Sequence, residues 1–179
     1  MTSAFPYKPN LYKFPRRVYP DANFLVSFYV PNHVWHTNAS TLLTELISKK
    51  VEIDISLLAM DEAICLLLII KYEDQNGNGS WKNDQPLKNN PQVCSSFHPE
   101  FSSFVAKLKS LSNVKFIDIP NSCEEILDDL LGNISSYSFA PRDACHLSIL
   151  KALNLEMIIT NDTDFERIND LPITVLHFW

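Results

Sequence analysis

The sequence contains little glycine and carries no excess of positive charge. Only 3 of its 179 residues are glycine. Because neither a Gly-x-Gly-x-x-Gly nor a Walker pattern occurs, a glycine-rich loop that cradles nucleotide phosphates is not expected. The net charge of −6 argues against broad electrostatic attraction to nucleic acid, which normally needs a basic face. An acidic centre filled with metal ions and rimmed by local cations would escape this objection.

Long apolar runs and paired cysteines are also missing. The longest apolar run, residues 63–70, is too short to cross a bilayer, and Pro6, Lys8 and Pro9 stand where a signal peptide would have its apolar stretch. The four cysteines include no Cys-x-x-Cys pair, so we expect them to be reduced, with Cys65 acting as a small buried hydrophobe. The sequence therefore predicts a cytoplasmic protein that makes no membrane contact.

Hydrophobic residues make up 46% of the chain, which is enough for one domain with a sizeable core. We predict an N-terminal lead-in at residues 1–15 and a single domain at 16–179. Within it, the polar, Asn-rich segment 73–92 is predicted to be a long loop or an insertion. Strands are expected at 16–19, 51–55, 114–119, 156–160 and 173–177, and helices at 23–50 with a break near Pro31, 56–72, 97–111, 122–131 and 141–154. Alternating strands and helices indicate an α/β fold, with a central parallel sheet of about five strands covered on both faces.

Four acidic motifs are spaced so that this sheet can bring them together. Asp21 directly follows the first strand and Asp162 the fourth, while Asp143 opens the helix that leads into the fourth strand. Glu62 falls about two turns into the helix after the second strand. Ligands of such sheets bind at the carboxyl ends of the strands, so all four carboxylates can reach one place. Crowded carboxylates repel one another unless a cation sits between them, and such a cluster is typical of sites for hard divalent cations.

Taken singly, three of these acids have ordinary explanations. Asp21 suits a turn, Asp162 suits an N-cap, and Asp143 suits the first turn of a helix. Glu62 has no such ordinary explanation. It lies in the most apolar stretch of the chain, where an ionised side chain is costly unless it is paired with another group or bound to a cation. Its neighbour Asp61 points about a quarter-turn away, so we expect Glu62 to face inward and Asp61 to face solvent.

These motifs, in this order, resemble the PIN-domain ribonucleases, which include the VapC-type toxins of toxin–antitoxin pairs. The resemblance runs from about Arg16 to the C-terminus. It is carried by Asp21-Ala22-Asn23 after a strand, Asp61-Glu62 on an apolar helix, Arg142-Asp143-Ala144-Cys145-His146 on another helix, and Thr160-Asn161-Asp162-Thr163-Asp164-Phe165 after a strand. It implies a three-layer α/β/α fold, a nuclease centre that depends on Mg²⁺ or Mn²⁺, and hydrolysis of RNA phosphodiester bonds.

The resemblance also assigns residues. The catalytic and metal-binding acids would be Asp21, Glu62, Asp143 and Asp162, with Asp164 as an optional fifth ligand and with Asn23 and Thr160 as accessory polar residues. Arg142 and His146 are candidates for substrate binding, although a hydrogen-bonded structural histidine is the ordinary explanation for His146. Bound cations would lower the pKa of a water molecule and neutralise charge on the leaving oxygen.

Three functions are left open at this point. The first is a metal-dependent endoribonuclease that acts as a toxin and is restrained by a small antitoxin. A second copy of the chain is a further candidate partner. The second is a non-catalytic module that binds RNA or protein through the same fold. The third is a structure-specific DNA nuclease.

Overall fold

The fold is built on one sheet of parallel strands. The structure is a computed structural model and describes residues 4–90, 92–119 and 121–179. The strands are β1 (Ala4–Pro6), β2 (Arg17–Pro20), β3 (Glu52–Ile55), β4 (Val114–Phe116), β5 (Met157–Ile159) and β6 (Thr174–His177). They are arranged in the order β1-β6-β5-β2-β3-β4, and every pairing is parallel. All five predicted strands are present, and the prediction of a parallel α/β fold is confirmed.

The lead-in supplies a sixth strand that the sequence analysis did not expect. β1 pairs with β6 at the edge of the sheet, and the backbone N–H of Tyr7 donates to the carbonyl of His177. The Tyr7 hydroxyl then donates to Glu45 Oε2 at 2.6 Å. The described part of residues 1–15, which the sequence analysis set apart as a lead-in, therefore packs against the sheet and α2.

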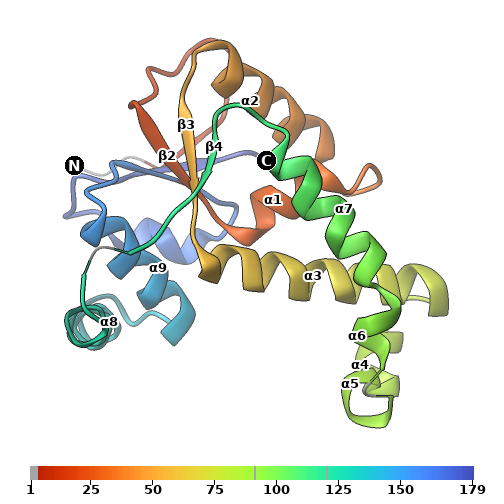
Figure 1. Cartoon of the computed structure of the whole chain (residues 1–179). Coiled ribbons are helices and arrows are strands. Elements are labelled where there is room, and N and C mark those ends of the chain that lie inside the picture. The colour runs from red at the N-terminus through yellow and green to blue at the C-terminus, as the bar shows by residue number, and fades with distance from the viewer. Residues whose placement is uncertain (1–3, 91, 120) are drawn as a thin grey trace.

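Helices cover both faces of the sheet. They are α1 (Ala22–Tyr29), α2 (His36–Ser48), α3 (Leu57–Asn76), α4 (Ser80–Asp84), α5 (Pro86–Asn89), α6 (Val93–Ser96), α7 (His98–Lys109), α8 (Cys123–Tyr137) and α9 (Pro141–Ala152), with a 3₁₀ helix, η1, at Thr163–Arg167. Figure 1 shows α1, α2 and α7 on one side of the strands and α8 and α9 on the other. The molecule therefore has the three layers of an α/β/α fold.

Local sequence signals explain where the main helices begin and end. α1 ends at Tyr29, and Val30 is already extended, as expected for a residue that precedes proline. Ser56 caps α3 by accepting a hydrogen bond from the Ala59 N–H. Ser122 and Glu125 form a reciprocal capping box at the start of α8, which stabilises its first turn.

The polar segment 73–92 is only partly a loop. Residues 73–76 complete α3, which ends at Gly77 with φ of +95°, a conformation that favours glycine. The short helices α4 and α5 follow, and Trp81 of α4 packs edge-on against Tyr72 of α3 at 5.7 Å between ring centroids. Around them lies a second, small apolar cluster that includes Leu68, Val93 and Phe97. The segment predicted as a long loop or an insertion therefore contains short helices, and an aromatic contact joins them to α3.

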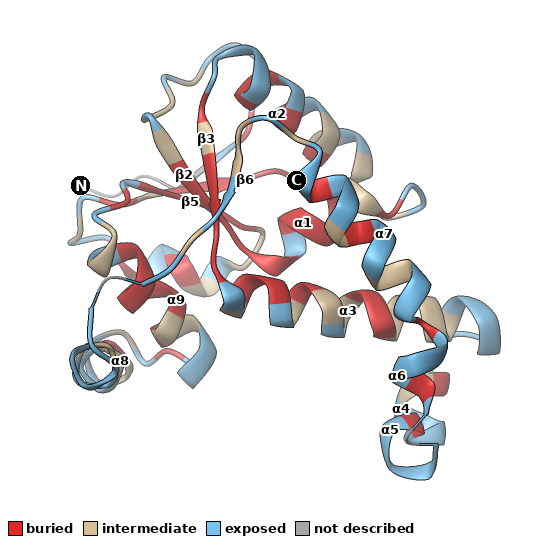
Figure 2. Ribbon diagram, viewed as in Figure 1, coloured by how far each residue is buried: buried red, intermediate tan, exposed pale blue. Residues whose placement is uncertain are grey.

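The main core lies between the sheet and its helices. Figure 2 shows buried residues along the strands and on the inner sides of α1, α2 and α9. Cys65, expected to be buried, is exposed, although all four cysteines are free as predicted. In the part of the chain that the structure describes, no helix is long and apolar enough to cross a membrane.

Candidate active site

The order in which the chain adds strands to the sheet reverses at its centre, between β2 and β5. The chain continues from β2 to β3 and β4 on one side, whereas β5 and β6 lie on the other. Asp21 directly follows β2 and Thr160 directly follows β5, and the Asp21 N–H donates to the carbonyl of Ile159 at 3.0 Å. Ligands of parallel α/β sheets bind at this kind of switch point, at the carboxyl ends of the strands.

Asp21 is buried and held by hydrogen bonds on both oxygens. Its Oδ1 accepts from the Phe24 N–H at 3.0 Å, so Asp21 is the N-cap of α1. Its Oδ2 accepts from Thr160 Oγ1 at 2.5 Å and from Asn23 Nδ2 at 3.2 Å. Burial raises the pKa of Asp21 to about 6, although the Thr160, Phe24 and Asn23 hydrogen bonds oppose that rise. The two predicted accessory residues, Asn23 and Thr160, thus both contact the carboxylate that they were expected to orient.

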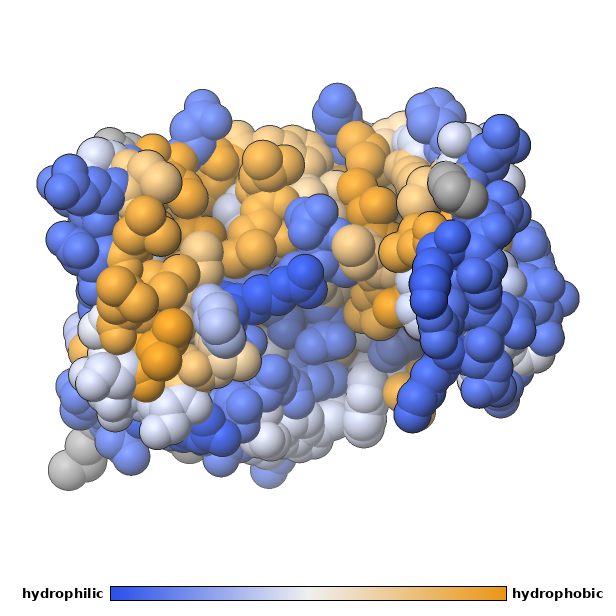
Figure 3. Space-filling view, turned by 90° about the horizontal axis from the view of Figure 1, so that it is seen from below, coloured by the Kyte–Doolittle hydropathy of each residue, from blue (hydrophilic) through white to orange (hydrophobic). Residues whose placement is uncertain are grey.

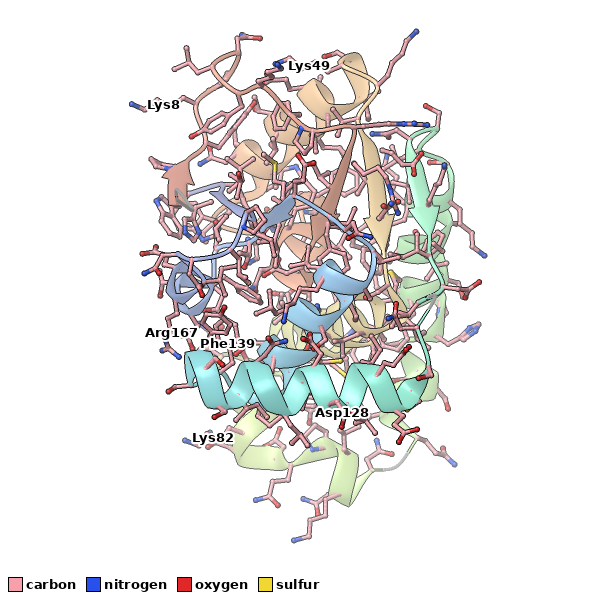
Figure 4. The ribbon with its side chains drawn as sticks, turned by 90° about the vertical axis from the view of Figure 1, so that its left-hand side faces the viewer. Lys8, Lys49, Lys82, Asp128, Phe139 and Arg167 are labelled. Atoms are coloured by element: carbon pink, nitrogen blue, oxygen red, sulfur yellow. The ribbon has the colours of Figure 1, made fainter. Side chains whose placement is uncertain are left out.

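The acids after β5 are ordered by the same turn. Thr160 Oγ1 accepts from the Asp162 N–H at 2.9 Å, and Asp162 Oδ1 accepts from the Asp164 N–H at 2.8 Å, which makes Asp162 the N-cap of η1. Asp164 forms an ion pair with Arg167 at 2.6 Å. Arg167 also donates to the Ser138 carbonyl just beyond α8, and Figure 4 shows it beside that end of the helix. Asp164 is therefore partly neutralised by a neighbour on its own turn.

Glu62 faces inward and Asp61 is exposed, as predicted. Glu62 Oε2 lies 2.7 Å from His146 Nε2, and its Oε1 lies 3.6 Å from Arg142 Nε. The Arg142 side chain is 65% exposed, whereas that of Glu62 is 16% exposed. A cation at the rim and a buried histidine thus both contact the carboxylate that the sequence placed in an apolar helix.

Two further residues of this region were missed by the sequence analysis. Tyr19 of β2 is fully buried, and its hydroxyl lies 2.7 Å from His146 Nδ1 and 2.6 Å from Ser56 Oγ. Ser56 was expected only as the cap of α3. The signal available was that Tyr19 precedes Asp21 by two residues, and side chains with that spacing point to the same face of a strand.

Asp143 connects the acidic groups electrostatically. It lies half-buried in the first turn of α9. Burial raises its pKa most, and the negative charges of Asp162, Asp164 and Glu62 raise it further, while His146 opposes them. The carboxylates of α3 and of the turn after β5 are therefore near enough to Asp143 of α9 to repel its negative charge.

The donor set can be compared with the needs of a divalent cation. Among the described residues, no three His, Cys, Asp or Glu side chains are close enough to hold a metal ion together. The available donors are nonetheless carboxylate oxygens, which suit hard cations such as Mg²⁺ and Mn²⁺, and their repulsion at Asp143 is what a cation would relieve. The residues fit such an ion in donor type and in charge, and the predicted ligand set stays a prediction.

The surroundings of the acidic groups are mixed in polarity. Figure 3, which views the molecule from the side of α3, shows hydrophilic side chains between hydrophobic areas. Exposed apolar side chains at this end include Leu57 at the start of α3 and Leu127 and Leu131 on α8.

Comparisons with known proteins gave likenesses in structure alone. No family model matches the sequence, and no curated protein matches it. Solved structures are similar to it over most of its length, two of them being VapC20 and VapBC2. VapC20 of Mycobacterium tuberculosis, described as a sarcin-ricin loop cleaving toxin, has a TM-score of 0.57 and 13% identity, with 87% of this chain and 98% of that chain covered.

The second similar structure is VapBC2 from Rickettsia felis, bound to a DNA fragment from their promoter. Its TM-score is also 0.57, with 16% identity, and the match covers 91% of this chain and 99% of that chain. Both neighbours are matched almost from end to end, and the likeness extends over most of this chain. The chain therefore has the PIN-domain fold of the VapC proteins.

Proposed function

We propose that this protein is a metal-dependent endoribonuclease that hydrolyses RNA phosphodiester bonds. Two observations carry the proposal. Asp21 and Asp162 follow neighbouring strands at the switch point of the sheet and both hydrogen-bond Thr160, and the charges of Asp162, Asp164 and Glu62 act on Asp143. The fold supports it, because VapC20, which has the same fold, is described as a toxin that cleaves the sarcin-ricin loop.

The acidic residues would hold the cation. We assign this role to Asp21, Glu62, Asp143 and Asp162, with Asp164 as a further candidate ligand. When bound, Mg²⁺ or Mn²⁺ supplies positive charge that lowers the pKa of a water molecule and offsets charge on the phosphate.

The other residues of the site have supporting roles. Thr160 and Asn23 hold the Asp21 carboxylate in place, so it needs little rearrangement to act as a ligand. Arg142, which is largely exposed beside Glu62, offers a guanidinium to an approaching phosphate. No side chain needs to act as a nucleophile in this scheme, because water attacks the phosphorus.

We also propose a small antitoxin as a protein partner. The fold is shared with VapBC2, which is described as bound to a DNA fragment from their promoter. The exposed leucines of α3 and α8, at positions 57, 127 and 131, would lose contact with water in such a complex. A second copy of the chain stays a predicted partner.

The proposal is tested by substitution of two acids that lie on different elements. Manganese-dependent cleavage of single-stranded RNA should disappear in Asp21→Asn and Asp143→Asn proteins, while circular dichroism shows that both remain folded. Asp128→Asn is the matched control, because Asp128 is exposed on α8 and takes no part in the acidic centre. It should cleave like the wild type.

Four outcomes would contradict the proposal. Cleavage that persists in both acidic variants, or that continues in excess chelator, would exclude a carboxylate-bound metal centre. Binding of RNA without turnover, unaffected by the substitutions, would favour a non-catalytic module. Cleavage of DNA but not of RNA in parallel assays would show a DNA nuclease.

A further inference from the structure

Four side chains from three parts of the chain form a continuous run of hydrogen bonds beside the acidic centre. Ser56 Oγ lies 2.6 Å from the Tyr19 hydroxyl, which lies 2.7 Å from His146 Nδ1, and His146 Nε2 lies 2.7 Å from Glu62 Oε2. We call Ser56, Tyr19, His146 and Glu62 the relay. Because the first three are at most 2% exposed, they cannot touch a substrate, and they can influence chemistry only through Glu62.

The hydrogen bonds of the relay have one consistent direction when the imidazole is neutral. An ionised carboxylate only accepts, so His146 Nε2 must donate to Glu62. The ring then has no proton left on Nδ1, which accepts from the Tyr19 hydroxyl. Burial raises the pKa of the Tyr19 phenol, so it keeps the proton that it donates. Its oxygen accepts in turn from Ser56, whose own oxygen accepts from the Ala59 N–H.

The relay fixes one oxygen of Glu62 and leaves the other free to interact at the site. Oε2 is held by His146, while Oε1 faces Arg142 across 3.6 Å. Glu62 is also one of the charges that raise the pKa of Asp143, after burial, Asp162 and Asp164, so the position of this carboxylate contributes to the field at the acidic centre. A glutamate has three rotatable bonds in its side chain, and without a partner it would sample several positions.

We propose that Tyr19 and His146 are positioning residues that orient Glu62 for catalysis and cation binding, with Ser56 completing their hydrogen bonds. This proposal rests on the proposed nuclease function. It assigns His146 a place behind the ligands rather than against the substrate, because both of its ring nitrogens are already engaged by protein groups. Partners that orient a metal-ligating side chain in this way contribute to both metal affinity and activity.

The test compares Tyr19→Phe with a matched control, Tyr137→Phe. Both substitutions remove one hydroxyl and keep the ring, but the Tyr137 hydroxyl donates to Asp170 away from the site. Loss of an outer partner of a metal ligand typically costs about 10- to 100-fold in metal affinity or activity. We therefore expect Tyr19→Phe to raise the Kd for Mn²⁺ and to lower kcat by about tenfold or more, with KM for RNA nearly unchanged. Tyr137→Phe should have the wild-type Kd for Mn²⁺, kcat and KM for RNA.

A second pair of variants separates positioning from packing. His146→Gln keeps a nitrogen donor that can reach Glu62, whereas His146→Leu keeps only the bulk of the side chain. We expect the His146→Gln protein to keep part of the wild-type affinity for Mn²⁺ and the His146→Leu protein to lose it. The measurement is Mn²⁺ binding to each folded protein. If the His146→Leu protein does not fold, ¹⁵N NMR of the His146 ring in the wild-type protein tests the relay instead. The relay requires that the ring carries its proton on Nε2. It also requires that the ring signals change in the Tyr19→Phe protein.

The possible failures can be told apart. A Tyr19→Phe protein that binds Mn²⁺ and cleaves RNA like the wild type overturns the positioning role and leaves the proposed function intact. A neutral His146 protonated on Nδ1 overturns the direction of the relay and the role with it. A wild-type protein that neither binds Mn²⁺ nor cleaves RNA overturns the proposed function, and the positioning role falls with it.

Discussion

Replacing Asp21 by asparagine should make the metal-free protein more stable at neutral pH. Asp21 is buried at the end of β2, and burial raises its pKa to about 6. Asparagine has nearly the same shape and ranks with aspartate as an N-cap. Its oxygen can accept from the Phe24 N–H, and its amide can donate to Thr160 Oγ1. The substitution therefore removes a buried charge and keeps the cap of α1, while the hydrogen bond with Thr160 reverses its direction and the one from Asn23 is lost.

The magnitude and the pH range follow from the same pKa. The difference between about 6 and the ordinary value of 3.8, at about 1.4 kcal/mol for each pH unit, corresponds to about 3 kcal/mol. Because the pKa is raised in the folded state, this contribution of Asp21 to stability is fully present below pH 3.8 and is lost as the pH rises through 6. Asparagine does not titrate. The variant should gain up to about 3 kcal/mol over the wild type at pH 7.5 and almost nothing at pH 4.

The assay is urea denaturation followed by tryptophan fluorescence, in excess chelator, at several pH values from 4 to 7.5. Asp128→Asn, which changes an exposed acid, is the control and should show only a small difference that does not vary with pH. An Asp21→Asn protein that is less stable than the wild type at pH 7.5 would refute the reasoning. A difference that is the same at every pH would refute it too, because the effect would then not arise from the charge.

Three shorter predictions concern other parts of the molecule. Tyr7→Phe removes the buried hydrogen bond to Glu45 and should cost about 1–2 kcal/mol in urea denaturation; an unchanged midpoint would contradict the packing of the lead-in. Arg17→Met removes the guanidinium 2.6 Å from the fully buried Asp54 and should cost about 1–3 kcal/mol in the same assay, and no loss would show that this ion pair is dispensable. Saturating Mn²⁺ should raise the melting temperature of the wild type, and of Asp143→Asn by less; equal shifts would argue against Asp143 as a ligand.

The sequence by itself determined the parts of this protein that depend on neighbouring residues. The strands, the break at Pro31 and the cap at Ser56 follow from periodicity and from the chemistry of one or two side chains. The order of strand and acid likewise placed Asp21 and Asp162 at one edge of a parallel sheet. These features were predictable because each is encoded within a few residues along the chain.

The tertiary structure decided which side chains meet. The resemblance named Thr160 as an accessory residue, but only the fold shows that it donates to Asp21, 139 residues away. The hydrogen bonds of His146 to Tyr19 and Glu62 likewise join segments 127 and 84 residues apart. The pairing of β1 with β6 was likewise invisible, because a three-residue strand has too little pattern to predict. Contacts of this kind depend on the order of the strands and on the packing of helices over them. A local sequence pattern encodes neither, so only the folded chain shows them.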